Sequence, residues 1–199
     1  MLIREKTINF ASLIHLFMDI ITEQDQTPWY AIKLFTLQLK NVRGYFDTKE
    51  LEYFVPMMYV DIEDKETHRI KHELRPVVSN LIFVKKTMAE KEMRKIVFDC
   101  PYKMAVIKKS RESIDYYEIP AKQMYEFQMM CNPEIEMRTY LSETEAKLKK
   151  GSPVLVKYGP LKGLTGKLVR SSKKYYLLKE VPGMAVMLKV SRWCCTPIE

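Results

Sequence analysis

The stretch from Val154 to Val169, which reads VLVKYGPLKGLTGKLV, limits the possible fold of this chain more than any other segment. It places Gly159-Pro160 between two strand-like runs and adds Gly163 and Gly166 at intervals of three residues. Proline fixes φ at about −65°, and glycine accepts positive φ or the close approach of another backbone segment. The spacing therefore predicts two short strands joined by a sharp turn, in which these four residues serve backbone geometry.

Two more strands are expected after this pair. Tyr175 to Leu178 and Met184 to Val190 are rich in branched and aromatic residues, and Val181-Pro182-Gly183 between them has the order that a type II turn requires. Several short strands in such a compact segment favour a small closed barrel, because closure removes exposed strand edges.

Charge is concentrated in the same region. Residues 149–199 contain eleven Lys or Arg and two Glu, a net charge of +9, so the first 148 residues carry −1 of the overall +8. This asymmetry favours a polyanionic partner for the C-terminal unit, with nucleic acid as the first candidate. A basic surface that only maintains solubility or protects strand edges is the alternative.

The four cysteines are Cys100, Cys131, Cys194 and Cys195. None forms a C-x-x-C pair or has a histidine beside it at metal-ligand spacing. They indicate reduced thiols in a cytoplasmic protein, and we expect no metal and no cofactor.

Residues 1–27 contain an apolar run from Ile8 to Ile21 that Ser12, His15 and Asp19 interrupt. The run is too short and too polar for a membrane span, and its pattern predicts an amphipathic helix. We therefore expect no membrane contact from this segment.

Residues 28–132 predict an antiparallel α+β domain with helices on one face of its sheet. The domain is expected to begin with strand 29–35 and a helix that has Leu39, Val42 and Phe46 on one face. Strand 52–62, interrupted at Pro56, a charged hairpin tip at 61–73 and strand 74–84 follow. The last expected elements are a helix from a capping box at Thr87 to Phe98, strand 104–108 and a helix that begins at Pro120. The polar segment 133–150 is the expected linker, in which Ser142-x-x-Glu145 can start a short helix. The barrel then occupies residues 151–199.

Four motifs in this order carry a family resemblance: Trp29 to Lys33, Phe54 to Met57, Ser79 to Val84, and the Gly159-Pro160 unit. Together they resemble the NusG family of transcription factors, whose N-terminal domain precedes a KOW-type SH3-like barrel. The second and third motifs are most similar to the specialised RfaH and UpxY-type branch. Ser79 and Leu81 depart from the family pattern, which has proline and often tyrosine there.

The resemblance implies a monomeric elongation factor that binds the clamp helices of the RNA polymerase β′ subunit. It would act as an antiterminator or processivity factor for a specific operon, such as one for polysaccharide biosynthesis. The residues that it assigns to polymerase binding are Trp29, Tyr30, Ile32, Phe54, Pro56, Leu81 and Phe83. Leu81 and Phe83 alternate with Ile82 and Val84, so one pair faces the core and the other faces outward. The sequence leaves open which pair is which, and all four can be core residues.

The resemblance also implies a second partner for the barrel, which is nascent RNA or DNA, a ribosomal protein or a termination factor. Lysines with tyrosines between them suit phosphate attraction and base stacking. The residues expected at this surface are Tyr158, Lys162, Lys167, Lys173, Lys174 and Tyr175, and either Tyr175 or its neighbour Tyr176 should lie in the barrel core.

Two other functions compete with this interpretation. A KOW-type RNA-binding or ribosome-associated protein explains the basic barrel but gives the first domain no role. An enzyme is disfavoured, because His68-x-x-x-His72 lacks a third ligand and the chain has no phosphate-binding or nucleophile motif.

Overall fold

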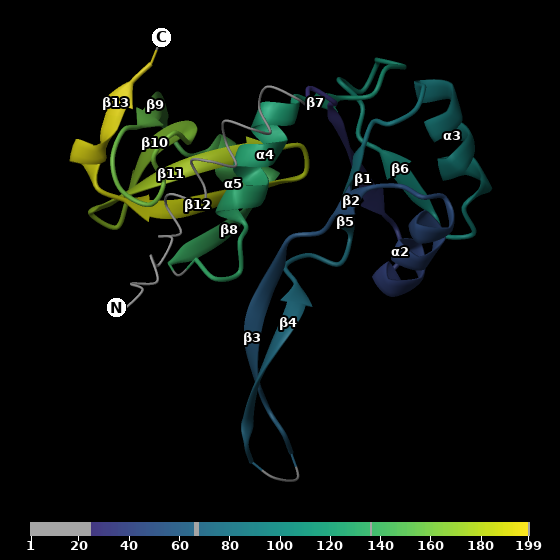
Figure 1. The fold of residues 1–199 in the computed structure, drawn as a ribbon, viewed down its shortest axis with the longest axis horizontal. Helices are drawn as coiled ribbons and strands as arrows, with labels where there is room; N and C mark the ends of the chain where they lie inside the picture. The colour runs from purple at the N-terminus through teal and green to yellow at the C-terminus, as the bar shows by residue number, and fades with distance from the viewer. Residues whose placement is uncertain (1–24, 66–67, 136, 199) are drawn as a thin grey trace, which may run out of the picture.

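The computed structural model describes residues 25–65, 68–135 and 137–198. The chain forms an N-terminal unit, residues 25–131, and a C-terminal unit, residues 138–198, with helix α4 (Ala121–Met130) between their sheets (Figure 1). The amphipathic helix expected in residues 1–27 lies almost entirely outside the described residues. In the described ranges, no helix is long and apolar enough to cross a membrane.

An antiparallel sheet of order β2-β5-β1-β6 forms the centre of the N-terminal unit, and β7 also pairs with β1. Its strands are β1 (Trp29–Leu34), β2 (Tyr53–Phe54), β5 (Leu81–Lys85), β6 (Met104–Val106) and β7 (Glu118–Ile119). In the central pair, Ala31 lies opposite Phe83 and Ile32 lies opposite Ile82. The residues from Leu81 to Val84 are all buried, so both faces of the sheet are covered. The predicted α+β class is confirmed.

Helices cover both faces of this sheet, which corrects the expectation of helices on one face only. Tyr30, Ile32, Ile82 and Val84 pack with α2 (Leu39–Thr48) and α3 (Glu90–Asp99). The buried residues of α2 are Leu39, Val42 and Phe46, the three that its periodicity predicted. Ala31, Leu81 and Phe83 project from the other face and pack with α4.

Helix α3 starts later than the sequence predicts. Its N-cap is Ala89, not Thr87, and the Glu92 carboxylate accepts a hydrogen bond from the Ala89 N–H at 3.3 Å. Alanine has no side-chain acceptor, so only this half of a capping box is present.

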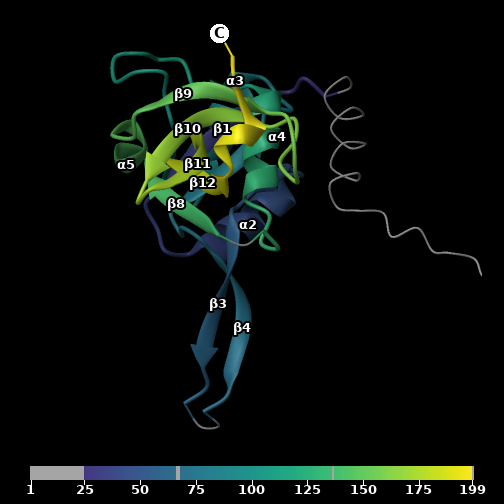
Figure 2. The same ribbon diagram turned by 90° about the vertical axis from the view of Figure 1, so that its left-hand side faces the viewer.

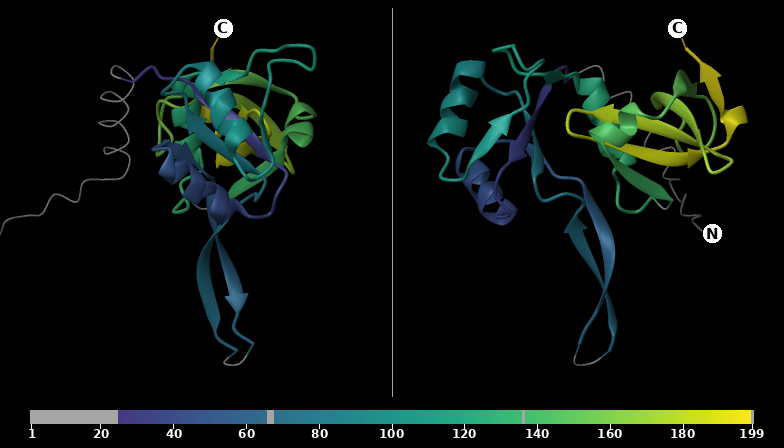
Figure 3. Two further views of the ribbon diagram at one scale, coloured as in Figure 1. Left: turned by 90° about the vertical axis from the view of Figure 1, so that its right-hand side faces the viewer. Right: turned by 180° about the vertical axis from the view of Figure 1, so that it is seen from behind.

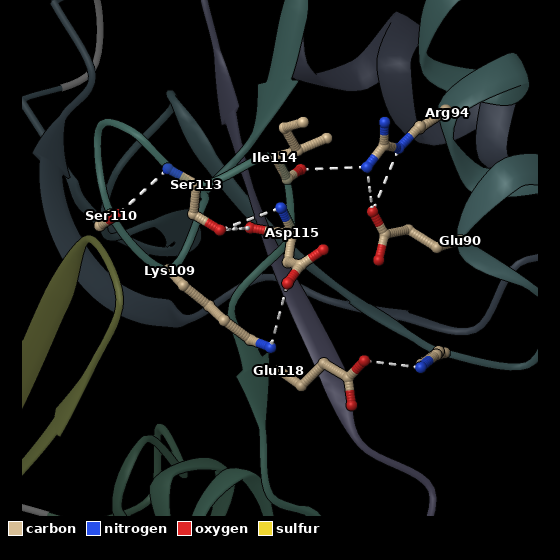
Figure 4. Close-up of polar contacts among 9 residues, drawn as sticks. Glu90, Arg94, Lys109, Ser110, Ser113, Ile114, Asp115 and Glu118 are labelled. Atoms are coloured by element: carbon tan, nitrogen blue, oxygen red, sulfur yellow. Dashed lines mark hydrogen bonds and ion pairs between the residues drawn. The ribbon is translucent and has the colours of Figure 1, made fainter.

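Polar contacts fix the loop between β6 and β7 beside α3 (Figure 4). The Arg94 guanidinium pairs with Glu90 and donates to the carbonyl of Ile114 at 3.0 Å. Within the loop, Asp115 N–H donates to the Ser113 hydroxyl at 3.0 Å. These contacts hold the loop next to the edge of the sheet that β6 and β7 form.

A long hairpin projects from the N-terminal unit (Figure 2). It consists of β3 (Met57–Glu63) and β4 (Ile70–Pro76), and these two strands pair only with each other. Pro56 marks the point where the chain leaves the main sheet, as a proline without an N–H donor should. The single strand predicted at 74–84 is wrong, because β4 ends at Pro76 and β5 begins at Leu81.

The C-terminal unit is an antiparallel sheet of order β13-β9-β10-β11-β12-β8. Its strands are β8 (Arg138–Ser142), β9 (Gly151–Val156), β10 (Thr165–Ser171), β11 (Lys174–Val181), β12 (Met184–Val190) and β13 (Cys195–Pro197), and the short 3-10 helix η1 (Arg192–Cys194) precedes β13. Val154 and Val156 are the buried side chains of β9. Leu177, Leu178 and Val181 of β11 and residues 184–188 of β12 are also buried. The structure therefore has the small β-unit expected at this end of the chain. Its path of paired strands ends at β13 and β8, which do not pair with each other, so the closure expected of a barrel is absent among the described strands.

Ordered elements occupy the expected linker at 133–150. Strand β8 pairs with β12, and α5 (Glu143–Lys147) follows it directly. Ser142 caps α5 as predicted: its hydroxyl accepts from the Glu145 N–H at 3.3 Å, and its own N–H donates to the Glu145 carboxylate at 2.8 Å. The connection between the units thus supplies an edge strand of the C-terminal sheet.

Candidate functional site

The face of the N-terminal sheet that carries Leu81 and Phe83 holds a cluster of aromatic rings. The ring centroid of Phe83 lies 5.4 Å from that of Phe127 on α4 and 6.4 Å from that of Phe54 on β2. Phe54 and Phe127 meet edge to face at 6.4 Å. Trp29 belongs to the same cluster. We call Trp29, Phe54, Leu81 and Phe83 the apolar sheet face.

The structure brings together some of the residues assigned to polymerase binding and separates others. Trp29, Phe54, Leu81 and Phe83 lie on one face, whereas Tyr30 and Ile32 are fully buried on the opposite face among the residues of α2 and α3. Period-two alternation along β1 forces this separation. One partner surface cannot contact both sets while the domain remains folded. Pro56 is buried where β2 leads into the hairpin.

The C-terminal unit covers the apolar sheet face. An added Cβ on Gly183, in the turn between β11 and β12, would lie 3.0 Å from both Leu81 δ-carbons. Gln123 on α4 donates to the carbonyl of Glu180 on β11 at 2.8 Å. One continuous apolar cluster runs from Ala31 and Phe83 through α4 into the C-terminal sheet. The right-hand view of Figure 3 shows from behind how α4 lies against β11 and β12.

A charged network is buried at this contact. Glu126 on α4 is 1% exposed, and its carboxylate pairs with the Lys179 ammonium of β11, whose side chain is 11% exposed. The same carboxylate accepts from the Thr165 N–H at 3.1 Å and from the Thr165 hydroxyl at 2.9 Å. Lys179 also donates to the Thr165 carbonyl at 3.0 Å. Burial of a carboxylate is tolerated only with such partners, so this network depends on contact between the two units.

Cys131, the C-cap of α4, is buried at the same boundary. Burial raises the pKa of its thiol to about 12, because a thiolate is unfavourable in apolar surroundings. Arg138 and Tyr140 of β8 lie beside this thiol. The reactivity of this thiol toward an alkylating reagent should therefore report whether the two units are in contact.

The glycines of the Gly159-Pro160 stretch have two different roles. Gly159 and Gly163 have φ of +87° and +90°, the left-handed conformation that favours glycine. Gly166 is instead a close-approach position, where a Cβ would lie 2.7 Å from the carbonyl oxygen of Leu178.

The basic residues predicted on the C-terminal unit do not form one surface. Lys167 pairs with Glu180 at 2.7 Å near the boundary with α4. Lys173 and Lys174 are exposed at the turn between β10 and β11, and Lys162 is exposed between β9 and β10. Tyr175 lies beneath two arginines, whereas Tyr176 packs on a small interior cluster with Leu178 and Ala185.

Sequence reasoning missed the most exposed aromatic side chain of this unit, Trp193, which is 75% exposed. It also missed Phe127 and Glu126 as interface residues. A buried position for Phe127 was visible in the helical spacing, but a lone glutamate on a helix gives no sequence signal that it is buried.

The fold and the face define a two-unit α+β protein: an N-terminal sheet with an apolar, aromatic face, and a small basic β-unit seated on it. The family model described as transcription termination factor NusG matches residues 27–128, which include the whole N-terminal sheet and most of α4. The chain belongs to the NusG family of transcription factors. No curated protein is similar enough to the chain to count as a match.

Proposed function

We propose that this protein is a transcription elongation factor that binds the clamp helices of the RNA polymerase β′ subunit through its apolar sheet face. The observation that carries the proposal is the extent of the family match. The matched region contains Trp29, Phe54, Leu81 and Phe83, and it ends before the C-terminal unit that covers them.

Physical chemistry supports a second protein for this face. Its aromatic rings provide a large apolar area, and two packed helices are a natural partner for an apolar groove on a sheet. Because the C-terminal unit now occupies the face, polymerase binding requires that unit to move away. The apparent affinity then falls by the fraction of molecules in the open state.

The specific task that we propose is suppression of pausing and termination on a particular operon, such as one for polysaccharide biosynthesis. A factor that binds the elongating conformation of polymerase more tightly than the paused one shifts the population toward elongation. The C-terminal unit, which we propose to be a KOW unit, is then free to contact another component of the transcription or translation machinery.

In vitro transcription with purified polymerase tests this function. The protein should increase read-through of a terminator downstream of its own operon's leader, and it should co-purify with core polymerase. Co-purification with ribosomes but not with polymerase would instead support the ribosome-associated alternative and reject the proposal.

A further inference from the structure

The hairpin of β3 and β4 has a free edge along its second strand. Among the described strands, β3 and β4 pair only with each other, and residues 70–75 of β4 are all exposed. A two-stranded sheet is only marginally stable in water, and an unpaired strand edge is a template for another strand. The hairpin projects from the rest of the protein, so this edge is accessible (Figure 1 and Figure 2).

Two features that commonly protect a strand edge do not interrupt β4. Its pairing with β3 runs without a bulge from Met57 opposite Pro76 to Glu63 opposite Ile70. The one proline of β4 is its last residue, Pro76. Charged side chains also protect an edge, but they repel a second strand only where like charges come opposite each other. The order of the charges along β4 therefore decides which strand can pair with it.

Three exposed apolar side chains lie on one face of the hairpin. Tyr59 lies opposite Leu74, and Ile70 is on the same face because it is four residues from Leu74 along the strand. Tyr59, Leu74 and Ile70 are 47%, 45% and 66% exposed. Apolar side chains that gather on one exposed face indicate a contact surface.

The β4 edge is complementary to the same edge of a second copy of this chain. We consider two β4 strands that pair antiparallel about a two-fold axis at His72. Ile70 then lies opposite Leu74 of the second copy, and Lys71 lies opposite Glu73 of the second copy. The symmetry repeats both pairs on the other side of the axis. Apolar pairs and opposite charges directly across from each other stabilise antiparallel strands.

The neighbouring registers lack this match. Residues that face each other must share a face of the sheet, so the axis can move only by whole residues. An axis at Glu73 sets Glu73 against itself and Lys71 against Arg75, and an axis at Lys71 sets Lys71 against itself. With the axis at His72, Arg75 meets Arg69, which lies outside β4. The pattern of β4 therefore favours the axis at His72.

The charges of β4 remain available to a second copy. Within the hairpin, Lys71 contacts Asp64 at 2.7 Å and Arg75 contacts Glu73 at 3.1 Å. The cations of both pairs are exposed, so each pair contributes little to stability, and a carboxylate can accept from two cations at once. Pairing between copies therefore breaks no strong contact.

Strand β3 offers no equivalent edge. It carries Asp61 and Glu63 but no basic residue, so two β3 strands cannot form an ion pair in any register. Asp61 also pairs with His72 at 2.5 Å, so each imidazole at the axis has a carboxylate of its own chain beside it. A two-fold contact uses the same edge on both copies, and association through β4 therefore stops at the dimer.

We propose that the β4 edge is a dimerisation surface, at which residues 70–74 of two copies of this chain join their hairpins into one four-stranded antiparallel sheet. On one face of this sheet, Tyr59 and Leu74 form a continuous apolar row with Ile70 of the second copy. A contact of this size belongs to the weak, transient class, so monomer and dimer exchange. The dimer differs from the monomer that the family resemblance implies, and it does not depend on polymerase binding.

Sedimentation velocity of the full chain at increasing concentration tests this proposal. The average mass should rise from that of the monomer toward that of the dimer between about 5 μM and about 500 μM, the range in which a weak interface is populated. Lys71→Glu alone and Glu73→Lys alone should each weaken the dimer at least about tenfold, because each sets like charges opposite each other on both sides of the axis.

An equimolar mixture of these two variants is the sharpest comparison. In the mixed dimer, the two carboxylates of one copy lie opposite the two ammonium groups of the other, so the mixture should associate although neither variant does so alone. Lys95→Glu makes the same charge change at an exposed position of α3 and should dimerise like the native chain.

The proposal is overturned if the native chain stays monomeric over this range, if its mass continues to rise beyond that of the dimer, or if the mixture associates no better than either variant alone. Matching far-ultraviolet circular dichroism of the variants and the native chain establishes that all of them are folded. Polymerase is absent from this assay, so its failure is distinct from failure of the proposed function.

Discussion

Lys179 on β11 and Glu126 on α4 form an ion pair across the boundary between the two units, where both side chains are largely withdrawn from water. The family match ends within α4, so the pair links the matched domain to the unit that covers it. Removal of one partner from a buried pair is costly, because the other charge stays buried. This contact is the clearest point at which the covering of the apolar sheet face can be weakened.

Lys179→Ala should weaken the contact between the units by about 3 kcal/mol, the usual scale for a broken buried pair. Such a change corresponds to a rise of about a hundredfold in the population of the open state. The rate of alkylation of the buried Cys131 thiol, followed by mass spectrometry, measures that population. Lys189→Ala, at an exposed lysine of the same unit, is the control and should leave the rate unchanged. Equal rates for the two variants would show that the pair does not hold the units together.

The pKa of Cys131 leads to a pH prediction. Burial raises this pKa from 9.0 to about 12, so the thiol favours the folded state through its neutral form. The stabilisation by the neutral thiol is fully present below about pH 9 and is lost as pH rises toward 12. The loss occurs because the thiol of the unfolded chain releases its proton at a lower pH than the thiol of the folded chain. The loss should reach roughly 1.4 kcal/mol per pH unit between these limits. Urea unfolding from about pH 8 to pH 11 should show this slope as a difference between the native chain and Cys131→Ala, and parallel curves would contradict the assignment.

Gly183 and Gly159 provide a matched pair for the contact with Leu81. Both have φ near +90°, at +91° and +87°, but only Gly183 has another residue's atoms within 4 Å of an added Cβ. Gly159→Ala should therefore lower the free energy of unfolding by only about 1 kcal/mol, the conformational penalty of a positive φ for alanine. Gly183→Ala should cost more, because its methyl group meets Leu81, and part of the excess should disappear in the Leu81→Ala background. Equal costs, measured by urea unfolding, would place Leu81 away from this turn.

Phe83→Ala should destabilise the fold by about 3 to 5 kcal/mol, since the ring is fully buried between Phe54 and Phe127. Phe98→Ala, at a phenylalanine that is 88% exposed, should change the free energy of unfolding by less than about 0.5 kcal/mol. If both variants melt like the native chain, Phe83 is not a packed residue. Truncation of Phe83 thus alters stability as well as any binding, and interface charges are better sites for testing the partner.

Local pattern predicted much of the fold. The spacing of Leu39, Val42 and Phe46 identified the buried face of α2, and Pro120 marked the start of α4. The same reasoning could not decide which residues of Leu81 to Val84 face a partner, because α2 and α3 bury one face and α4 with the C-terminal unit buries the other. An apolar run has the same sequence whatever covers it.

Contacts between distant segments account for most of what was missed. Trp193 meets Tyr158 across 35 positions of sequence, and Glu126 meets Lys179 across 53. Helix or strand periodicity in the sequence indicates neither contact. Strand β8 was missed for a different reason: it is a polar edge strand, so it lacks the alternation that identifies a half-buried strand.

The affinity of the full chain for isolated clamp helices of the polymerase β′ subunit tests the central claim most directly. The comparison is between the native chain, Lys179→Glu, which sets two carboxylates against each other at the boundary, and Lys162→Glu, which makes the same charge change at an exposed site. We predict that Lys179→Glu binds at least about tenfold more tightly than the native chain, because release of the C-terminal unit uncovers the apolar sheet face, while Lys162→Glu binds like the native chain. No binding by any of the three, or equal affinity of Lys179→Glu and Lys162→Glu, would contradict the account.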